Sequence, residues 1–290
     1  MKLLAKFNLV YLLVMSLGIA LSGVIARQLL QDNAKQETIA SAQMLMEKAL
    51  AVRNYTNTQI KPLLVAQMTE KFLPQTVPSY SATEVLGTLL AKHPEFAYKE
   101  ATLNPTNPRD RATSWEADIV GQFRSAAELK EAVGTRDTPA GPSLYIARPL
   151  RITDPACLAC HSSVEAAPAS MVAQYGPANG FGWKLNEVIG AQIVSVPLGV
   201  PLERADNVFK IFITSVVGVF VVVGVVLNLM IWLLVVRPVT RLSALADRVS
   251  QGDLDAPEFK ASGRDEIATL SDSFSRMRAS VVQAMKLLDA

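Results

Sequence analysis

The sequence predicts a protein of mixed α+β class that is anchored in a membrane by two helices. Two runs of apolar residues, 7–26 and 211–236, are each long enough to cross a bilayer as a helix. Residues 28–70 contain no glycine and a single proline, Pro62, and their apolar repeats favour one long helix. Three short segments are strand-like and are bounded by Pro, Asn or Gly, namely 96–102, 143–149 and 192–197.

The composition is more hydrophobic than is usual for a globular domain and directs attention to membrane spans. Hydrophobic residues make up 50% of the 290 residues, and the mean hydropathy is +0.25. The net charge is only +2 and charged residues are 19%, so nothing indicates nucleic acid or another polyanion as a partner.

The first apolar run lies in a predicted N-terminal anchor at residues 1–27. Lys2 and Lys6 precede the run, and Asn8 and Ser16 interrupt it. A cleaved signal peptide is the alternative, because Ala20-Leu21-Ser22 resembles a small-residue cleavage site. The apolar stretch exceeds the usual length of a signal peptide core, so we expect an anchor that is not cleaved.

The second apolar run defines a predicted second membrane helix at residues 208–236. Arg237 and Arg241 follow it and favour the cytoplasmic side, in agreement with the lysines at the N-terminus. We therefore expect both termini in the cytoplasm of a bacterial inner (plasma) membrane. Residues 28–207 would form a periplasmic domain, with loops at 104–114 and 134–142.

Residues 237–290 form a third predicted region, with two amphipathic stretches joined by a polar connector at 251–263. Apolar residues recur at intervals of three and four, the pattern by which helices bury a seam against partner helices. Two short helices bury little by themselves, so the pattern implies a homodimer. The seam residues are Val239, Leu242, Ala246 and Val249, then Ile267, Leu270, Phe274, Met277, Val281, Ala284 and Leu288.

Three short motifs mark the boundaries of these two stretches, and their order and spacing resemble a HAMP linker. They are Arg237-Pro238-Val239, Gly252-Asp253-Leu254 and Asp265-Glu266-Ile267. The resemblance implies a parallel four-helix bundle in a homodimer, between a membrane helix and a cytoplasmic output. An amphipathic tail on the membrane surface is the alternative. HAMP proteins usually continue into an output domain near the position of Ala290, so we expect either a separate signalling partner or a longer natural chain.

The motif Cys157-Leu158-Ala159-Cys160-His161 carries the predicted chemistry. In a C-x-x-C-H motif the two thiols form thioethers with haem, and the adjacent imidazole is an axial ligand of the iron. A disulfide, a redox-active pair and half of a zinc site are the alternatives. Redox pairs do not need the histidine, and His93 is the only other Cys or His in the sequence. We therefore predict one covalently attached haem c.

Further residues make the chain similar to the Tll0287-like (DUF3365) haem domains over most of residues 40–200. The resemblance implies a PAS-like fold with a long N-terminal helix and a small antiparallel sheet that holds the haem. Its motifs are Arg53-Asn54-Tyr55, Lys61-Pro62, Leu103 to Pro108, Trp115-Glu116, Pro149-Leu150-Arg151, Tyr175-Gly176, Gly180-Phe181 and Gly190 to Leu198.

The resemblance also suggests further haem contacts. Arg53 and Tyr55 lie on the helix expected to face the haem and are candidate contacts; ordinary helix surface is the alternative. The sixth iron ligand stays open, because the sequence has no third cysteine. His93, a methionine (Met44, Met46, Met68 or Met171) and an open or water-bound site are the candidates.

The order of span, haem domain, span and HAMP linker favours a membrane-anchored c-type haem sensor. Such a sensor would detect redox state or a small gaseous ligand and signal to a cytoplasmic protein. The alternative is an electron-transfer or accessory subunit of a membrane complex, working with a redox partner. We do not expect an enzyme, because no distal His–Arg pair accompanies the motif.

Overall fold

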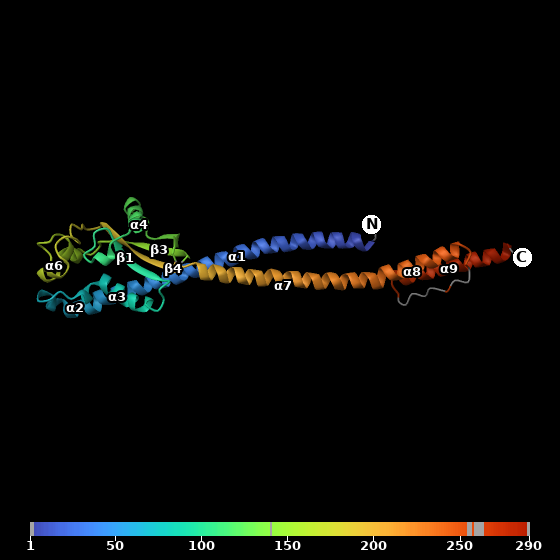
Figure 1. The fold of residues 1–290 in the computed structure, drawn as a ribbon, viewed down its shortest axis with the longest axis horizontal. Helices are drawn as coiled ribbons and strands as arrows, with labels where there is room; N and C mark the ends of the chain where they lie inside the picture. The colour runs from blue at the N-terminus through green and yellow to red at the C-terminus, as the bar shows by residue number, and fades with distance from the viewer. Residues whose placement is uncertain (1–2, 140, 254–256, 258–263, 289–290) are drawn as a thin grey trace. The chain divides into compact units, whose positions relative to one another are not determined.

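The computed structural model describes residues 3–139, 141–253, 257 and 264–288 (Figure 1). The chain divides into two units, Arg27–Asn207, and Met1–Ala26 together with Val208–Ala290. The predicted residues Lys2, Leu254 and Gly263 lie outside the described part of the chain.

Two helices, α1 (Leu3–Tyr55) and α7 (Gly199–Ile231), contain the predicted membrane spans. α7 continues through a π-helical turn, Trp232–Val236. Both helices are long and apolar enough to cross a membrane, which fits a membrane protein.

The two asparagines of the apolar runs, Asn8 and Asn228, are paired with each other. The side-chain amides of Asn8 and Asn228 exchange two hydrogen bonds, of 2.9 and 2.7 Å. The Tyr11 hydroxyl donates to the carbonyl of Phe220. Gly224 leaves space for the Tyr11 ring, since a Cβ on Gly224 would lie 3.0 Å from that ring. Amide groups in an apolar environment require such partners, so this pairing fixes the register of the two segments.

The predicted HAMP region contains two helices, α8 (Arg237–Ser250) and α9 (Glu266–Leu288). Pro238 is the second residue of α8 and follows directly on the π-helical turn Trp232–Val236, so the proline lies in a continuous helix beside an irregular turn. The Asp265 carboxylate accepts a hydrogen bond of 2.9 Å from the Ala268 N–H and so caps α9. Gly252, with φ +95°, follows the end of α8.

Residues 27–207 fold around a four-stranded antiparallel sheet with the strand order β1-β4-β3-β2. The predicted α+β class is therefore confirmed. The strands are β1 (Ala97–Thr102), β2 (Ala132–Thr138), β3 (Gly141–Arg151) and β4 (Val188–Pro197).

The loop expected at residues 134–142 was wrong, because most of this segment belongs to β2 and to the start of β3. β2 is an edge strand whose exposure alternates along its length. Its glycine and aspartate are typical of turns, but pairing with β3 outweighs that local preference. A Cβ on Gly134 would lie 2.5 Å from the Tyr145 hydroxyl, so a larger residue there would force the Tyr145 ring to move.

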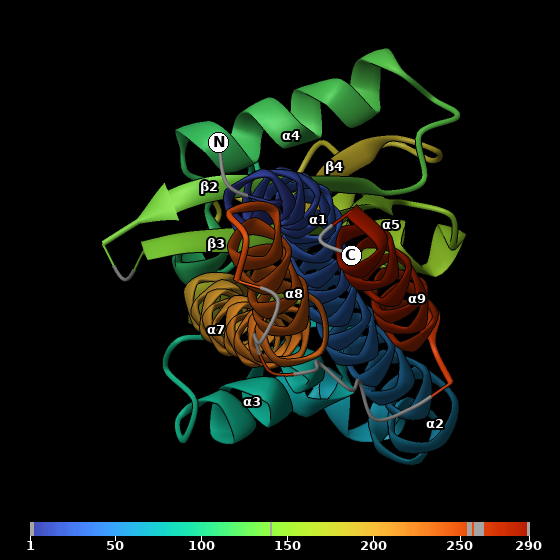
Figure 2. The same cartoon turned by 90° about the vertical axis from the view of Figure 1, so that its right-hand side faces the viewer.

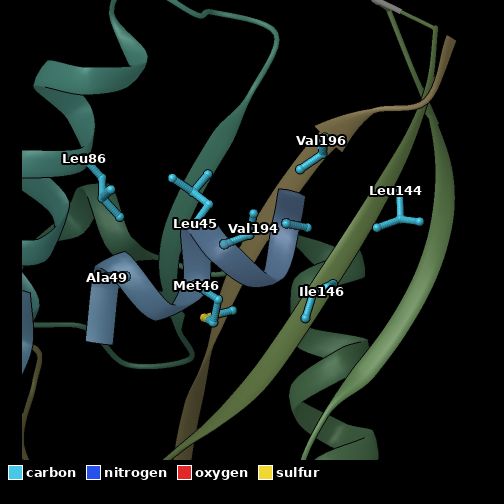
Figure 3. Close-up of a cluster of buried hydrophobic side chains, with 9 residues drawn as sticks. Leu45, Met46, Ala49, Leu86, Leu144, Ile146, Val194 and Val196 are labelled. Atoms are coloured by element: carbon cyan, nitrogen blue, oxygen red, sulfur yellow. The ribbon is translucent and has the colours of Figure 1, made fainter. Parts of the chain in front are cut away.

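Helices cover both faces of the sheet, as Figure 2 shows for α4. On one face, Met46 and Ala49 of α1 pack against Ile146 and Val194 in a fully buried cluster (Figure 3). On the other face, Phe123 and neighbouring residues of α4 pack on β1, β3 and β4. The shorter helices are α3 (Pro78–Leu90), α4 (Ser114–Ser125), α5 (Leu158–His161) and α6 (Ala169–Tyr175).

The long helix predicted for residues 28–70 is present but changes its winding near its end. After Tyr55 the chain forms a π-helical turn at Thr56–Ile60, a short α2 at Lys61–Leu64 and a 3-10 turn at Val65–Thr69. π-helical turns occur often at functional sites, and this one lies between Arg53 and Lys61, the two cations whose charges reach the cysteine motif.

Candidate functional site

The C-x-x-C-H motif forms two short helical turns that follow β3. Cys157 ends a 3-10 turn at Pro155–Cys157, and the other motif residues form α5. The Asp154 carboxylate caps this start by accepting a hydrogen bond of 2.9 Å from the Ala156 N–H. Helical spacing places residues three and four apart on one side, so Cys157, Cys160 and His161 share a side. Both cysteines are free and partly exposed.

The imidazole of His161 is held on two sides. Its Nδ1 lies 2.7 Å from the carbonyl oxygen of Gly180, and because a carbonyl only accepts, Nδ1 carries the proton and donates. The ring stacks on Trp183, with ring centroids 3.9 Å apart and planes inclined by 16°. Burial lowers the pKa of His161, although the Gly180 contact opposes this. Burial thus favours the neutral imidazole, and the proton on Nδ1 leaves Nε2 as the nitrogen that can bind a metal.

The segment that carries Gly180 is itself fixed by a loop that follows β1. The Asn104 side chain donates to the Phe181 carbonyl at 3.1 Å and accepts from the Gly180 N–H at 3.2 Å. Thr106 packs so closely that a Cβ on Gly180 would lie 2.1 Å from its hydroxyl oxygen. Gly180 also has φ +88°, a backbone conformation that favours glycine. The position of the His161 ring thus depends on a glycine in the chain segment 19 residues later.

Replacing Gly180 by alanine is expected to displace the Gly180 carbonyl and loosen His161. The alanine adds a left-handed backbone penalty of about 1–2 kcal/mol, and its Cβ also collides with Thr106. Gly182 provides a matched control, because it has φ +80° but no neighbouring atom within 4 Å of a Cβ. Thermal melting should show a larger loss for Gly180→Ala than for Gly182→Ala. Equal losses would mean that the contact with Thr106 is unimportant.

Two cations from the end of α1 and from α2 lie within electrostatic reach of the motif. Burial raises the pKa of the Cys157 and Cys160 thiols, and the positive charge of Lys61 opposes this at both. The guanidinium of Arg53 acts in the same way on Cys157. An acidic group bound at the cysteines would therefore be attracted by the positive charges of Lys61 and Arg53.

Of the two predicted contacts on α1, Arg53 lies near the motif but has a partner of its own. It donates to the Glu100 carboxylate, which is almost completely buried. Burial alone would lower the pKa of Arg53, but the Glu100 charge raises it. Tyr55 is 58% exposed, and among the described residues no hydrogen bond of its hydroxyl is found. Both residues remain predicted haem contacts.

The structure does not bring His93 to His161. His93 precedes the first residue of β1, which pairs with Ser195, whereas the motif follows the last residue of β3, which pairs with Val188. These are opposite ends of the sheet. The His93 side chain is 57% exposed and lies 3.6 Å from the Glu95 carboxylate. His93 as a sixth ligand remains an untested prediction that this placement does not support.

The candidate methionines differ in their surroundings. Met46 and Met171 are buried in the packed interior, while Met44 is 59% exposed. The sulfur of Met68 accepts a hydrogen bond of 3.3 Å from the Thr76 hydroxyl. Met46 belongs to the core cluster between α1 and the sheet, so its packing role accounts for its burial.

The donor set suits a covalently held haem. Two free thiols stand one helical turn apart, and the imidazole on the same side offers its Nε2 to a metal. Cys157 and Cys160 would carry the group, His161 would ligate its iron, and Lys61 and Arg53 would face its acidic groups. The sequence did not indicate the contacts made by Trp183, Gly180 and Glu100, because no local spacing connects these residues to the motif.

Comparison with known proteins gives two family matches. A family model described as Tll0287-like matches residues 31–197, more than half of the 290 residues. A model of the HAMP domain matches residues 230–283. A search of curated proteins found no match. A solved structure, that of the cyanobacterial haem protein Tll0287, is similar at 17% identity and a TM-score of 0.41, covering 56% of this chain and 94% of the other.

Proposed function

Because the chain belongs to the Tll0287-like family, we propose that it is a membrane-anchored c-type haem sensor that signals through its HAMP domain. The input would be the redox state of the haem or a small diatomic ligand, and the output a cytoplasmic partner. The observation that carries the proposal is the combination, in one chain, of the His161 site with a HAMP domain that follows an apolar helix. A carrier that only transfers electrons needs an anchor but has no use for such a module.

When bound, haem would supply an iron that changes its charge or takes a small ligand. The protein's part is to hold and sense that group. Cys157 and Cys160 would fix its position, and His161 would be held in one orientation by the Gly180 carbonyl and the Trp183 ring. A shift of the imidazole would therefore displace the Gly180 segment, and through it the loop that contains Asn104.

The second unit of the chain supports transmission. The amide pair of Asn8 and Asn228 couples the two apolar segments side chain to side chain. A displacement of α7 along its axis would have to break that pair or carry Asn8 with it. We propose that the two segments move as one element, with both termini in the cytoplasm.

Exposed apolar residues on α9 support a homodimer. Leu270, Met277 and Val281 belong to the predicted seam, yet they are 48%, 55% and 41% exposed in the single chain. Of the predicted seam, Leu242 on α8 is buried within the single chain, and on α9 the buried residues include Ala268, which is outside the seam. Helices bury such a seam against partner helices, and a second copy of the HAMP region would supply them.

Cysteine cross-linking tests this function. In the intact protein in membranes, Leu270→Cys should form a disulfide between two copies, at a rate that differs between the oxidised and reduced haem or on addition of CO. Ala279→Cys, which lies outside the seam, should cross-link slowly under all conditions. An identical Leu270→Cys rate in every haem state would refute signalling through this bundle.

A second candidate, an electron-transfer subunit, is favoured by the partial exposure of both cysteines. A haem attached there would lie near the surface, where electrons exchange readily with a redox partner. Absorption and EPR spectra of the intact protein in both oxidation states separate the candidates. A six-coordinate low-spin iron with no response to CO, together with unchanged cross-linking, would favour electron transfer.

A further inference from the structure

A pocket lies beside the N-terminal end of α4, in the unit formed by residues 27–207. Its volume is about 530 Å³, within the range of about 300–1,000 Å³ typical of small-molecule sites. Lys99, Ile193 and Ser195 line it, and Ile193 belongs to the cluster under α4. Neighbouring strand residues point to opposite faces, so this wall is the sheet face opposite to Glu100 and Arg53. The pocket is thus distinct from the cysteine motif.

The wall of this pocket has an apolar part. Ala97, Ile193 and the indole of Trp115 contribute to its lining. α4 packs on one part of this sheet face through Phe123 and Val120 and leaves the part near its first turn open. Water in such a space is readily displaced by a ligand with an apolar body.

Two of the three cations in the pocket are already neutralised by acidic partners. Lys99 donates to the Glu116 carboxylate at 2.8 Å. Arg109 pairs with Glu84 at 2.5 Å and lies 3.6 Å from Asp110. Burial raises the pKa of Asp110 to about 6, so at pH 7.5 this carboxylate is ionised and is a second negative charge beside Arg109.

The third cation is Arg136. Its guanidinium carbon lies 4.0 Å from the centre of the Trp115 ring, and no ion pair found among the described residues includes it. Stacking occupies a face of the guanidinium and leaves its N–H edge for a planar anion. An oriented cation without an ion-pair partner, beside an apolar wall, favours an anion with an apolar body.

We propose that this pocket binds a small organic carboxylate, with Arg136 as the residue that pairs with the carboxylate group. Arg136 is the most suitable partner because, among the cations of the described lining, it is the one without an ion pair and is oriented by Trp115. A carboxylate matches the planar fork of a guanidinium in two parallel hydrogen bonds. The rest of the ligand would lie against Ala97, Ile193 and Trp115. The site is independent of haem and adds a second chemical input to the domain.

Calorimetric titration of the intact protein with benzoate at pH 7.5 tests this site. Wild type is expected to bind benzoate saturably at one site, and benzyl alcohol, which has the ring without the charge, should not bind. Arg136→Gln should weaken binding by at least about tenfold, as expected for loss of a charge-assisted hydrogen bond. Lys48→Gln removes an exposed cation of α1 outside the pocket and should leave binding unchanged.

A second variant tests the cavity without removing a charge. Ala97 lies at the exposed start of β1 and lines the pocket, so Ala97→Phe should fill the space and abolish benzoate binding while Arg136 stays in place. Absence of saturable benzoate binding by wild type would overturn the proposal. Unchanged affinity in either folded variant, or equal binding of benzyl alcohol or inorganic phosphate, would also overturn it.

Discussion

Replacing Cys157 and Cys160 together by alanine is expected to abolish covalent haem attachment completely. Each thioether bond requires one of these two thiols, and the sequence has no other cysteine. The haem stain of the chain on a denaturing gel should disappear, and the mass of the protein should fall by one haem. His161→Ala should keep the covalent group and alter its absorption spectrum, because it removes only the iron ligand.

Ala159, which lies between the two cysteines, provides the control. Ala159 is exposed, and Ala159→Ser keeps the spacing and all three functional side chains. This variant should retain the haem stain at the wild-type level. Stain that survives in the double cysteine variant would refute the attachment, and loss of stain in Ala159→Ser would show only that the chain fails to mature.

The regular parts of the fold were predictable because their signals are local. Residues 28–70 contain no glycine, which favours a helix whatever the segment packs against. The structure has helix over most of this segment. The start of α9 is similarly local, since the Asp265 side chain caps a nitrogen three residues on. β2 was missed because its sequence suits a turn, and only its hydrogen bonds to β3 make it a strand.

The site was predictable only as far as the motif extends. Cys157, Cys160 and His161 lie within five residues, so their spacing alone indicates the chemistry. The groups that orient His161 come from Gly180 and Trp183, and a helix-spacing argument cannot connect them. Arg53 illustrates the same limit, because its partner Glu100 lies 47 residues away on a strand. Contacts of this kind depend on tertiary packing, which the sequence pattern does not specify.

Replacing Glu100 by alanine is expected to cause the largest loss of stability among single substitutions in the domain. The Glu100 side chain is only 2% exposed, and its carboxylate accepts hydrogen bonds from Arg53 and, at 2.6 Å, from the Tyr98 hydroxyl. Gln192 in turn donates to Tyr98 at 3.0 Å. Removing the carboxylate leaves a partly buried cation and a buried hydroxyl without their partner.

The cost of breaking such a buried pair is about 3–5 kcal/mol, and the lower end applies because Arg53 is 27% exposed. For a domain of this size, that loss corresponds to a fall in Tm of roughly 10 °C. Glu47→Gln is the matched control: its carboxylate also pairs with an arginine, Arg148, but is 58% exposed, so its loss should cost under about 1 kcal/mol. The loss of stability in Glu100→Gln should lie between the losses in these two variants, because the amide still accepts a hydrogen bond from Tyr98 but carries no charge to pair with Arg53.

If Glu100→Ala melted no lower than Glu47→Gln, the Arg53–Glu100–Tyr98 network would not hold α1 to the sheet. Arg53 would then be free to bind the haem instead.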